Sequence, residues 1–304
     1  MQKAISIIFI LLLVVLGLLF YIRDDKSIVN VEGDKIVEND KLKITFLDIG
    51  QGDATFIEFA DGQQMLVDCA IDGRVIEALG RVMEYWDHDI DYLLITHPDL
   101  DHYGGCEEVL NRFQVKNIIY NGFIKDYDDM WNSWWQAVQA EGANYIEIDS
   151  EEEWYIASTT LHFLYPDHSI VVDKNIPELD KETSVNNTSI VFEIEHKGNQ
   201  ILMMADAEAE LEKYLIDVYG DQLNTDFLKA GHHGSAGASS QEFIDMTTPE
   251  NAVFSCGLDN SFGHPSRRVI KRVERVSSTV WRTDLQGDIA IEVGESIEIK
   301  NPPT

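Results

Sequence analysis

Thr96-His97-Pro98-Asp99-Leu100-Asp101-His102 is the stretch of sequence that decides the fold. Residues 90–95 before it, apolar except for Asp91, predict a buried strand, and Gly104-Gly105 after it permits a tight turn into a helix over residues 107–113. Imidazole nitrogens and carboxylate oxygens grouped at such a strand-to-helix turn are the ligands that two neighbouring divalent cations require. A polar loop whose acids merely cap the next helix is the alternative, but it explains neither the alternating donors nor the doubled glycine. The stretch therefore predicts a metal site with the ligands His97, Asp99, Asp101 and His102.

Further candidate ligands follow three later segments of the chain. Asp206 ends the short apolar run of residues 201–205, and His232-His233 lies between two glycines after residues 226–230. His264 lies in the sequence Gly263-His264-Pro265. An isolated histidine is usually a surface residue or a satisfied core residue. Acids or histidines at the ends of three separate predicted strands instead favour one common site.

These motifs resemble the metallo-β-lactamase superfamily, and more closely the domain of that fold in ComEC-type competence proteins and their stand-alone relatives. The resemblance covers residues 43–293, with the motifs in the family's order. It implies a four-layer αββα sandwich with a mono- or dinuclear metal site along one edge. The matching stretches are residues 46–54, 66–68, 97–105, 187–191, 206, 229–235, 263–265 and 281–284.

The chain departs from the commonest form of this family at two positions. Asp99 stands where that form has a histidine, and a second family histidine has no convincing counterpart, because His162 lies inside an apolar run and His168 in a Pro-Asp-His turn. The ComEC-like branch shares both departures, with Asn187 and Ser189 in the region where the second histidine is expected. Carboxylates in place of imidazoles shift the preference from zinc toward manganese or magnesium. We therefore expect one or two divalent ions, zinc or manganese.

The resemblance also implies a role for each site residue. Asp101, His102, Asp206 and one of His232 and His233 would hold one cation, and His97, Asp99 and the shared Asp206 would hold the other. The expected catalytic residues are Asp101, which orients a metal-activated water, and His264, which donates to a phosphate oxygen or to the leaving group. Asp68 is expected to orient a ligand histidine. The remaining candidates for support or substrate contact are Asn187, Ser189, Lys229, Ser235 and Asn260.

The amino-terminal region predicts a membrane anchor. Residues 4–22 form an apolar run of 19 residues, which at about 1.5 Å per residue nearly spans a hydrocarbon core of ~30 Å. A cleavable signal peptide has a shorter apolar region that ends in small residues, whereas this run ends in Leu19-Phe20-Tyr21-Ile22-Arg23. Lys3 favours a cytoplasmic amino terminus. We predict a single-pass transmembrane helix in residues 1–22, a polar tether in residues 23–40, and one hydrolase domain in residues 41–304, outside the cytoplasm.

The charge balance restricts the substrate. With 54 acidic and 23 basic residues the net charge is −31, so the average field repels nucleic acid. Bound dications reverse the potential locally, so phosphodiester hydrolysis is compatible with this charge. Residues 266–276 predict an amphipathic helix whose basic face is either solvated or binds phosphate, and both interpretations stay open. Its cations are Arg267, Arg268, Lys271, Arg272 and Arg275.

Cysteine and tryptophan positions indicate packing rather than chemistry. The three cysteines, Cys69, Cys106 and Cys256, lack the spacing of a disulfide framework or a metal site. We expect Cys69 and Cys256 to be small core residues. The tryptophans in residues 131–135 fit a helix that either binds a sugar or base or packs on the sandwich, and packing is favoured.

Three functions remain open from the sequence. The leading hypothesis is a membrane-anchored, metal-dependent phosphodiesterase that acts on nucleic acid or on a cell-envelope polymer. A hydrolase of the lactonase or β-lactamase type is the second, and the oxygen-rich site makes it less attractive. The third is a non-catalytic accessory module in DNA uptake. The presence of nearly all expected ligands counts against this third hypothesis.

Overall fold

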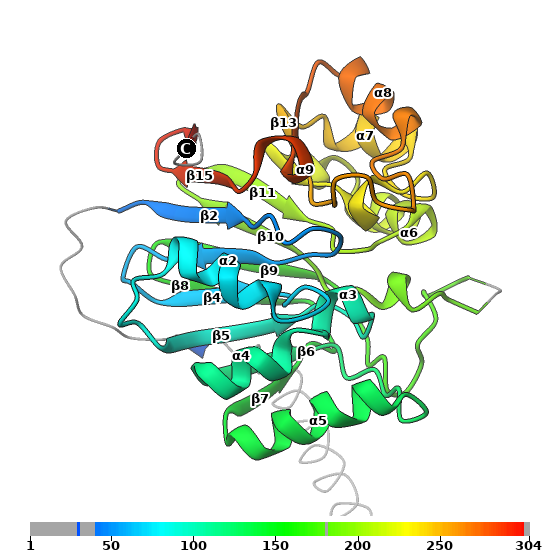
Figure 1. Cartoon of the computed structure of the whole chain (residues 1–304). Coiled ribbons are helices and arrows are strands. Elements are labelled where there is room, and N and C mark those ends of the chain that lie inside the picture. Colours follow the sequence, from blue (N-terminus) through cyan, green and yellow to red (C-terminus); the bar gives the residue numbers. More distant parts are fainter. Residues whose placement is uncertain (1–28, 31–39, 180–181, 301–304) are drawn as a thin grey trace, which may run out of the picture.

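Two eight-stranded sheets pack face to face at the centre of the molecule, and helices cover both outer faces (Figure 1). The computed structural model describes residues 29–30, 40–179 and 182–300. The two-sheet α/β sandwich implied by the sequence resemblance is thereby confirmed.

The first sheet combines antiparallel and parallel pairing. Strands β8 to β11 pair antiparallel, and β11 to β14 pair parallel. Its order is β1 (Val29–Asn30), β8 (Glu152–Ile156), β9 (Thr159–Tyr165), β10 (Val191–His196), β11 (Asn199–Met203), β12 (Phe227–Lys229), β13 (Asn251–Phe254) and β14 (Thr279–Arg282).

The second sheet is built in the same way. Strands β16, β15, β2, β3 and β4 pair antiparallel, and β4 to β7 pair parallel. Its order is β16 (Ile297–Lys300), β15 (Ile289–Val293), β2 (Leu42–Phe46), β3 (Thr55–Glu58), β4 (Gln64–Val67), β5 (Asp89–Ile95), β6 (Gln114–Tyr120) and β7 (Asn144–Glu147).

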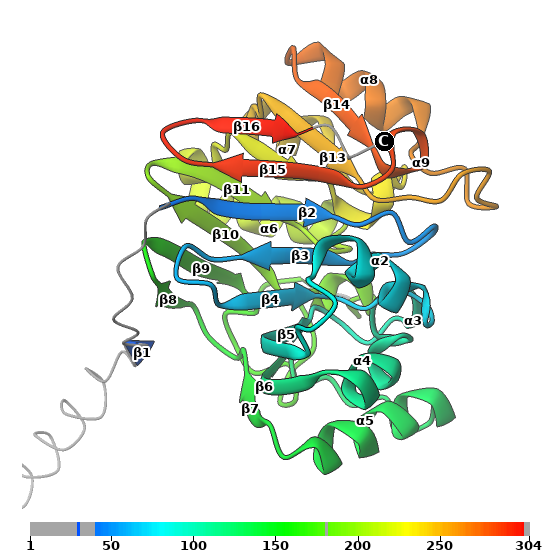
Figure 2. The ribbon, with the colours of Figure 1, turned by 60° about the vertical axis from the view of Figure 1, so that its left-hand side comes forward.

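The helices form the two outer layers (Figure 2). Those on the second sheet are α2 (Arg74–Val82), α4 (Cys106–Arg112) and α5 (Asp129–Glu141), with the short α3 (Leu100–Tyr103) at its edge. Those on the first sheet are α6 (Ala209–Tyr219), α7 (Gln241–Thr247) and α8 (Arg267–Arg275), with the short α9 (Thr283–Gln286) after β14. Three 3-10 turns complete the fold: η1 (Asn186–Thr188), η2 (Gly220–Leu223) and η3 (Gly231–Gly234).

Apolar patterning explains this layering. Strand β5 is a nearly continuous apolar run because a parallel strand in the middle of the sandwich is covered on both faces. Between the sheets, the rings of Phe46 and Phe227 stack with centroids 5.5 Å apart. In α5, Trp131 and Trp134 are buried in the helix–sheet core, which confirms the packing role favoured from the sequence.

One edge of the molecule collects the predicted site residues. The carboxyl ends of β4, β5, β11 and β12 are followed by Asp68, His97, Asp206 and His232-His233. Parallel strands present their carboxyl ends at the same edge, where α/β proteins commonly bind ligands. The polar ends of strands far apart in the sequence are therefore brought together.

The expectation that the cysteines form no disulfide was wrong, whereas Cys69 and Cys256 are core residues as expected. Cys69 and Cys106 form a disulfide with Cα atoms 5.1 Å apart, and Cys256 is buried and free. Gly105 makes this approach possible, because a Cβ there would lie 2.2 Å from the carbonyl oxygen of Cys69. The sequence spacing of 37 residues carries no signature of this contact, which only the β4–α4 packing creates.

The predicted membrane anchor, in residues 1–22, lies outside the described residues. Within the described part of the chain, no helix is both long and apolar enough to cross a bilayer.

Candidate metal centre

Asp206 is the centre of a buried cluster of acids and histidines. It follows β11 at the sheet edge and is only 2 % exposed. Its Oδ1 lies 3.3 Å from Nε2 of His102 and 3.5 Å from Nε2 of His233, and its Oδ2 lies 3.7 Å from Nε2 of His232. One carboxylate thus faces three imidazole rings.

Asp68 fixes the orientation of His102. Its Oδ2 accepts from His102 Nδ1 at 2.8 Å, and its two oxygens also accept from the backbone amide and the hydroxyl of Thr96. A carboxylate on Nδ1 keeps the proton there and leaves Nε2 free to face Asp206. This is the orienting role expected of Asp68.

His233 is held by the first sheet, where Ser255 follows the neighbouring strand β13. Its Nδ1 donates to the carbonyl oxygen of Ser255 at 3.0 Å, and its Nε2 lies 3.3 Å from Oδ2 of Asp101. His232 is partly exposed and lies between two carboxylates: its Nε2 faces Asp206 at 3.7 Å, and its Nδ1 faces Glu208 at 3.3 Å. Of the histidine pair, His233 is therefore the member that enters the buried cluster.

Sequence reasoning missed Asp53. Its carboxylate forms a buried ion pair with Lys229 at 2.8 Å and lies with His102, Asp206 and His233 in a group whose ligand atoms are all within 4.8 Å of one another. Gly52 brings it there, since a Cβ at Gly52 would lie 2.5 Å from the carbonyl oxygen of Asp101. The signal available in the sequence was an acidic residue that follows two glycines at the end of a predicted strand.

The atoms that converge on this cluster fit a bound cation. Nε2 of His97, His102 and His233 and Oδ1 of Asp206 are buried and have no hydrogen-bond partner in the described part of the chain. Buried polar groups are normally satisfied, so each such atom requires an explanation. Nitrogen and carboxylate oxygen are common ligands of zinc and manganese. The donor set therefore fits a divalent metal ion.

Electrostatics within the cluster agree with this interpretation. Burial would raise the pKa of Asp206, but positive charge on His233 and His102 outweighs it and holds that pKa well below its ordinary value. Burial would likewise lower the pKa of His102, but Asp206 and Asp68 raise it. Protons on these rings supply the positive charge that the carboxylates require. A divalent cation supplies the same charge.

The candidate ligands in the stretch of residues 96–102 are divided between the buried cluster and the surface. His97 is buried, with its ring centroid 4.2 Å from that of His102. Asp101 is partly exposed beside His233. Asp99 is not in the four-residue group: its side chain is 37 % exposed and pairs with Lys125 at 3.5 Å.

Left-handed backbone conformations gather around the cluster. Asp68, Ala70, Ala205, His232 and His233 all have positive φ angles between 45° and 61°. Each such residue costs on the order of 1–3 kcal/mol and persists where the surrounding structure holds it in place, often at functional sites. The concentration of this strain at one edge supports a functional role for that edge.

The remaining predicted residues fall into two groups. Asn187, Ser189 and Lys229 are buried: Asn187 Oδ1 accepts from the Glu208 amide at 2.8 Å, and Ser189 Oγ accepts from the Asp206 amide at 3.2 Å. These buried side chains therefore stabilise the site from inside the domain. Ser235, Asn260 and His264 lie at the rim, where Asn260 Oδ1 accepts from the His264 amide at 3.0 Å. The His264 ring centroid is 5.5 Å from that of His232 and 6.2 Å from that of His233.

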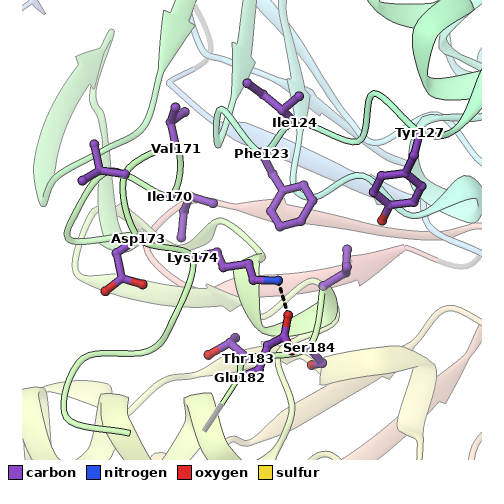
Figure 3. A pocket seen from close by; sticks show the side chains of 12 residues that line it. Phe123, Ile124, Tyr127, Ile170, Val171, Asp173, Lys174, Glu182, Thr183 and Ser184 are labelled. Atoms are coloured by element: carbon purple, nitrogen blue, oxygen red, sulfur yellow. Dashed lines mark hydrogen bonds and ion pairs between the residues drawn. The ribbon is translucent and has the colours of Figure 1, made fainter. Parts of the chain in front are cut away.

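A cavity of about 640 Å³ lies among residues 123–127, 170–174 and 182–185, and no member of the cluster lines it (Figure 3). Residues 123–127 form one wall, where Lys125 pairs with Asp99, and residues 182–185 form another, where Ser184 donates to Glu208 at 2.9 Å. Its lining is mixed: Phe123 and Ile170 are apolar, and Lys174 reaches across to Glu182.

Comparison with known proteins agrees with the fold. The family model described as "Metallo-beta-lactamase superfamily" matches residues 47–257. "ComE operon protein 3" of Bacillus subtilis is 29% identical over 274 residues, which is 81% of this chain and 32% of that protein. "Competence protein ComA" of Neisseria gonorrhoeae is 29% identical over 262 residues, or 85% and 33%. The chain thus spans about a third of the length of these curated relatives.

Solved structures share the architecture at lower identity. CmlA, a diiron beta-hydroxylase from Streptomyces venezuelae, matches with a TM-score of 0.53 and 16% identity, over 86% of this chain and 55% of its own. Igni18, a metallo hydrolase from Ignicoccus hospitalis, matches with a TM-score of 0.51 and 13% identity, over 84% of this chain and 100% of its own. At these identities the likeness concerns the fold alone.

Proposed function

The chain belongs to the metallo-beta-lactamase superfamily, and on that premise we propose that it is a metal-dependent hydrolase that cleaves phosphodiester bonds. The observation that carries the proposal is the convergence of four buried, unpartnered ligand atoms from His97, His102, Asp206 and His233 at one edge of the sandwich.

The chain offers a ligand set for at least one cation. Asp53, His102, Asp206 and His233 would hold it, with Asp101 at the exposed side of His233. A divalent cation there lowers the pKa of a water molecule and neutralises charge on substrate oxygens. His97, with its free Nε2 next to His102, is the natural ligand for a second ion.

Asp101 and His264 supply the remaining contacts. Burial acts to raise the pKa of Asp101, but the close contact with His233 and the charge of His102 hold it well below its ordinary value. Asp101 therefore stays ionised and orients a water by accepting its hydrogen bond. Burial and the charges of His233 and His232 lower the pKa of His264 to about 4. At neutral pH His264 therefore gives a phosphate oxygen a hydrogen bond rather than a proton.

Two arguments favour a phosphodiester over a lactone or a β-lactam. The carboxylates Asp53, Asp101 and Asp206 make the site rich in oxygen ligands, which suits manganese. The relatives carry the names competence protein and, in Haemophilus influenzae, recombination protein, which favours nucleic acid as the substrate. A cell-envelope polymer, a lactone or β-lactam, and a non-catalytic accessory role remain the alternatives that the experiment must separate.

We further propose that the domain is anchored to the cell membrane and lies outside the cytoplasm. The apolar run of residues 4–22 supplies the anchor. The disulfide between Cys69 and Cys106 supports the location, because such bonds persist in oxidising compartments and are rare in the cytosol.

Hydrolysis assays with purified protein test the proposed chemistry. Protein loaded with manganese or zinc should cleave bis(p-nitrophenyl) phosphate but not a chromogenic β-lactam or a lactone. Asp206→Ala should lose both the bound metal, measured by elemental analysis, and the activity, whereas Asp217→Ala on the exposed face of α6 should retain both. Cleavage of the β-lactam alone, or equal metal content in the two variants, would reject the proposal.

A further inference from the structure

Three basic side chains on α8 differ from the other charged residues of the domain. Among the lysines and arginines that the structure describes, only Arg267, Arg268 and Lys271 have neither an ion pair nor a side-chain hydrogen bond. All three are exposed. In a chain with 54 acidic residues, partners for them are abundant. Their lack of pairing therefore indicates a ligand of opposite charge.

The three cations form one continuous patch. Arg267 and Lys271 are four positions apart on α8, and Arg268 and Lys271 are three apart. Side chains at these spacings are neighbours on a helix surface, and like charges there destabilise the helix. The other side of α8 packs on the domain, because Val269 and Val273 are buried there. The free patch consequently faces solvent.

This patch begins beside the candidate metal centre. The backbone amide of Ser266, the residue before α8, donates to the carbonyl oxygen of Gly234 at 2.8 Å, and Gly234 directly follows His233. Figure 1 shows α8 at the outer end of the helical layer on the first sheet. A polyanion that enters the metal centre can therefore continue over α8.

An exposed aromatic ring lies at the edge of the cluster, five residues before α8 begins. Phe262 is 68 % exposed, although apolar rings of this size are usually buried. Its ring stacks on that of His264, with centroids 5.6 Å apart and an interplanar angle of 25°. His264 in turn borders His232 and His233. Phe262 therefore presents a flat face at the edge of the metal centre.

We propose that Phe262 and the free patch of α8 form a binding track for a single strand of nucleic acid. Phe262 stacks on a base next to the metal centre, and Arg267, Arg268 and Lys271 contact phosphates farther along the strand. An exposed ring recognises unpaired bases regardless of sequence, and a row of cations follows the backbone. A polyol phosphate, in contrast to nucleic acid, has no planar group on which the Phe262 ring can stack. The track rests on the proposed phosphodiesterase function, which it extends to polymeric substrates.

Binding measurements with two charge-matched variants test the patch. The probe is a short fluorescent oligothymidylate with uncleavable phosphorothioate linkages, and the readout is anisotropy over a range of salt concentrations. One variant is Arg267→Ala/Arg268→Ala/Lys271→Ala. The control is Lys116→Ala/Lys213→Ala/Lys300→Ala, which removes three exposed but paired cations. The α8 variant should bind at least tenfold more weakly than the control, with a log–log salt slope shallower by about 2. Equal affinities and slopes would overturn the track.

A second pair of variants tests the ring. Phe262→Ala should weaken binding of the oligothymidylate about fivefold or more, whereas Phe262→Tyr should bind within about twofold of the natural protein because it keeps the flat face. On an abasic strand of the same length, Phe262→Ala and the natural protein should bind equally. Equal affinity of the natural protein for poly(glycerol phosphate) and for the oligothymidylate would overturn the assignment to nucleic acid.

Failure of the track and failure of the proposed function have different signatures. If the natural protein cleaves bis(p-nitrophenyl) phosphate but the two triple variants bind the oligothymidylate equally, only the track is rejected. If neither manganese nor zinc supports cleavage of the small diester, the phosphodiesterase proposal is rejected, and the binding comparison still reports on the patch.

Discussion

Breaking the disulfide between Cys69 and Cys106 should destabilise the domain and loosen its metal centre together. The bond joins residues 37 positions apart, and for a loop of this length the chain-entropy relation gives about 4 kcal/mol at 25 °C. That is a large share of the total stability of a typical domain, about 5–15 kcal/mol. For a urea dependence of about 2–3 kcal/mol per molar, Cys69→Ala/Cys106→Ala should lower the unfolding midpoint by about 1–2 M.

The same bond joins two segments of the candidate metal centre. The amide of Cys69 donates to the carbonyl oxygen of His102 at 2.6 Å, and Asp68, which orients His102, precedes Cys69. Metal affinity, measured by competition with a chelator, should therefore fall with stability. Cys256→Ala is the control, since the free cysteine is not part of the bond, and this variant should keep the response to reductant. A midpoint that moves by less than about 0.3 M on full reduction, confirmed by mass spectrometry, would refute the reasoning.

Three further substitutions probe single interactions. Burial raises the pKa of Glu212 from 4.5 to about 7. The folded state therefore binds this proton more tightly than the unfolded state, and the free energy of unfolding falls as pH rises through this interval. Glu212→Gln should flatten the fall in urea midpoints between those pH values. Asp68→Asn removes the acceptor that holds Nδ1 of His102, and chelator competition should show metal affinity reduced about 10–100-fold. Lys229→Met leaves Asp53 buried without its partner and should cost about 3–5 kcal/mol in metal-free protein. The double variant Asp53→Asn/Lys229→Met should recover most of this loss in thermal unfolding.

Much of the fold could be predicted because local patterns survive in the tertiary structure. Residues 90–95 lie in β5, which extends over Asp89–Ile95, and they are apolar apart from Asp91 because the later part of the strand is covered on both faces. The amphipathic helix predicted over residues 266–276 is α8, and Val269 and Val273 are buried on its apolar side. Each of these segments has its own pattern of apolar residues, so its secondary structure can be predicted without knowing which segments pack against it.

The site was harder to predict because its members meet only after folding. Asp53 joins His102, Asp206 and His233 through the pairing of β2 and β3 and the close approach that Gly52 permits, and no spacing in the sequence records this. Asn187 and Ser189 were candidates for substrate contact or support, and only the structure shows that they brace backbone amides from inside the domain. Residue type identified the chemistry of these positions, but tertiary packing decided which atoms face the cluster.

The charge distribution explains why a strongly acidic chain can still bind a polyanion. At physiological ionic strength the Debye length is about 8 Å, so most of the 54 acidic side chains contribute little at the metal centre, whereas cations in contact with a phosphate act fully. At low salt this screening weakens, and the net charge of −31 opposes binding. A salt slope measured on the natural protein alone therefore mixes local attraction with global repulsion. The two triple variants have the same net charge, so the repulsion cancels between them, and their difference in slope isolates the contribution of Arg267, Arg268 and Lys271.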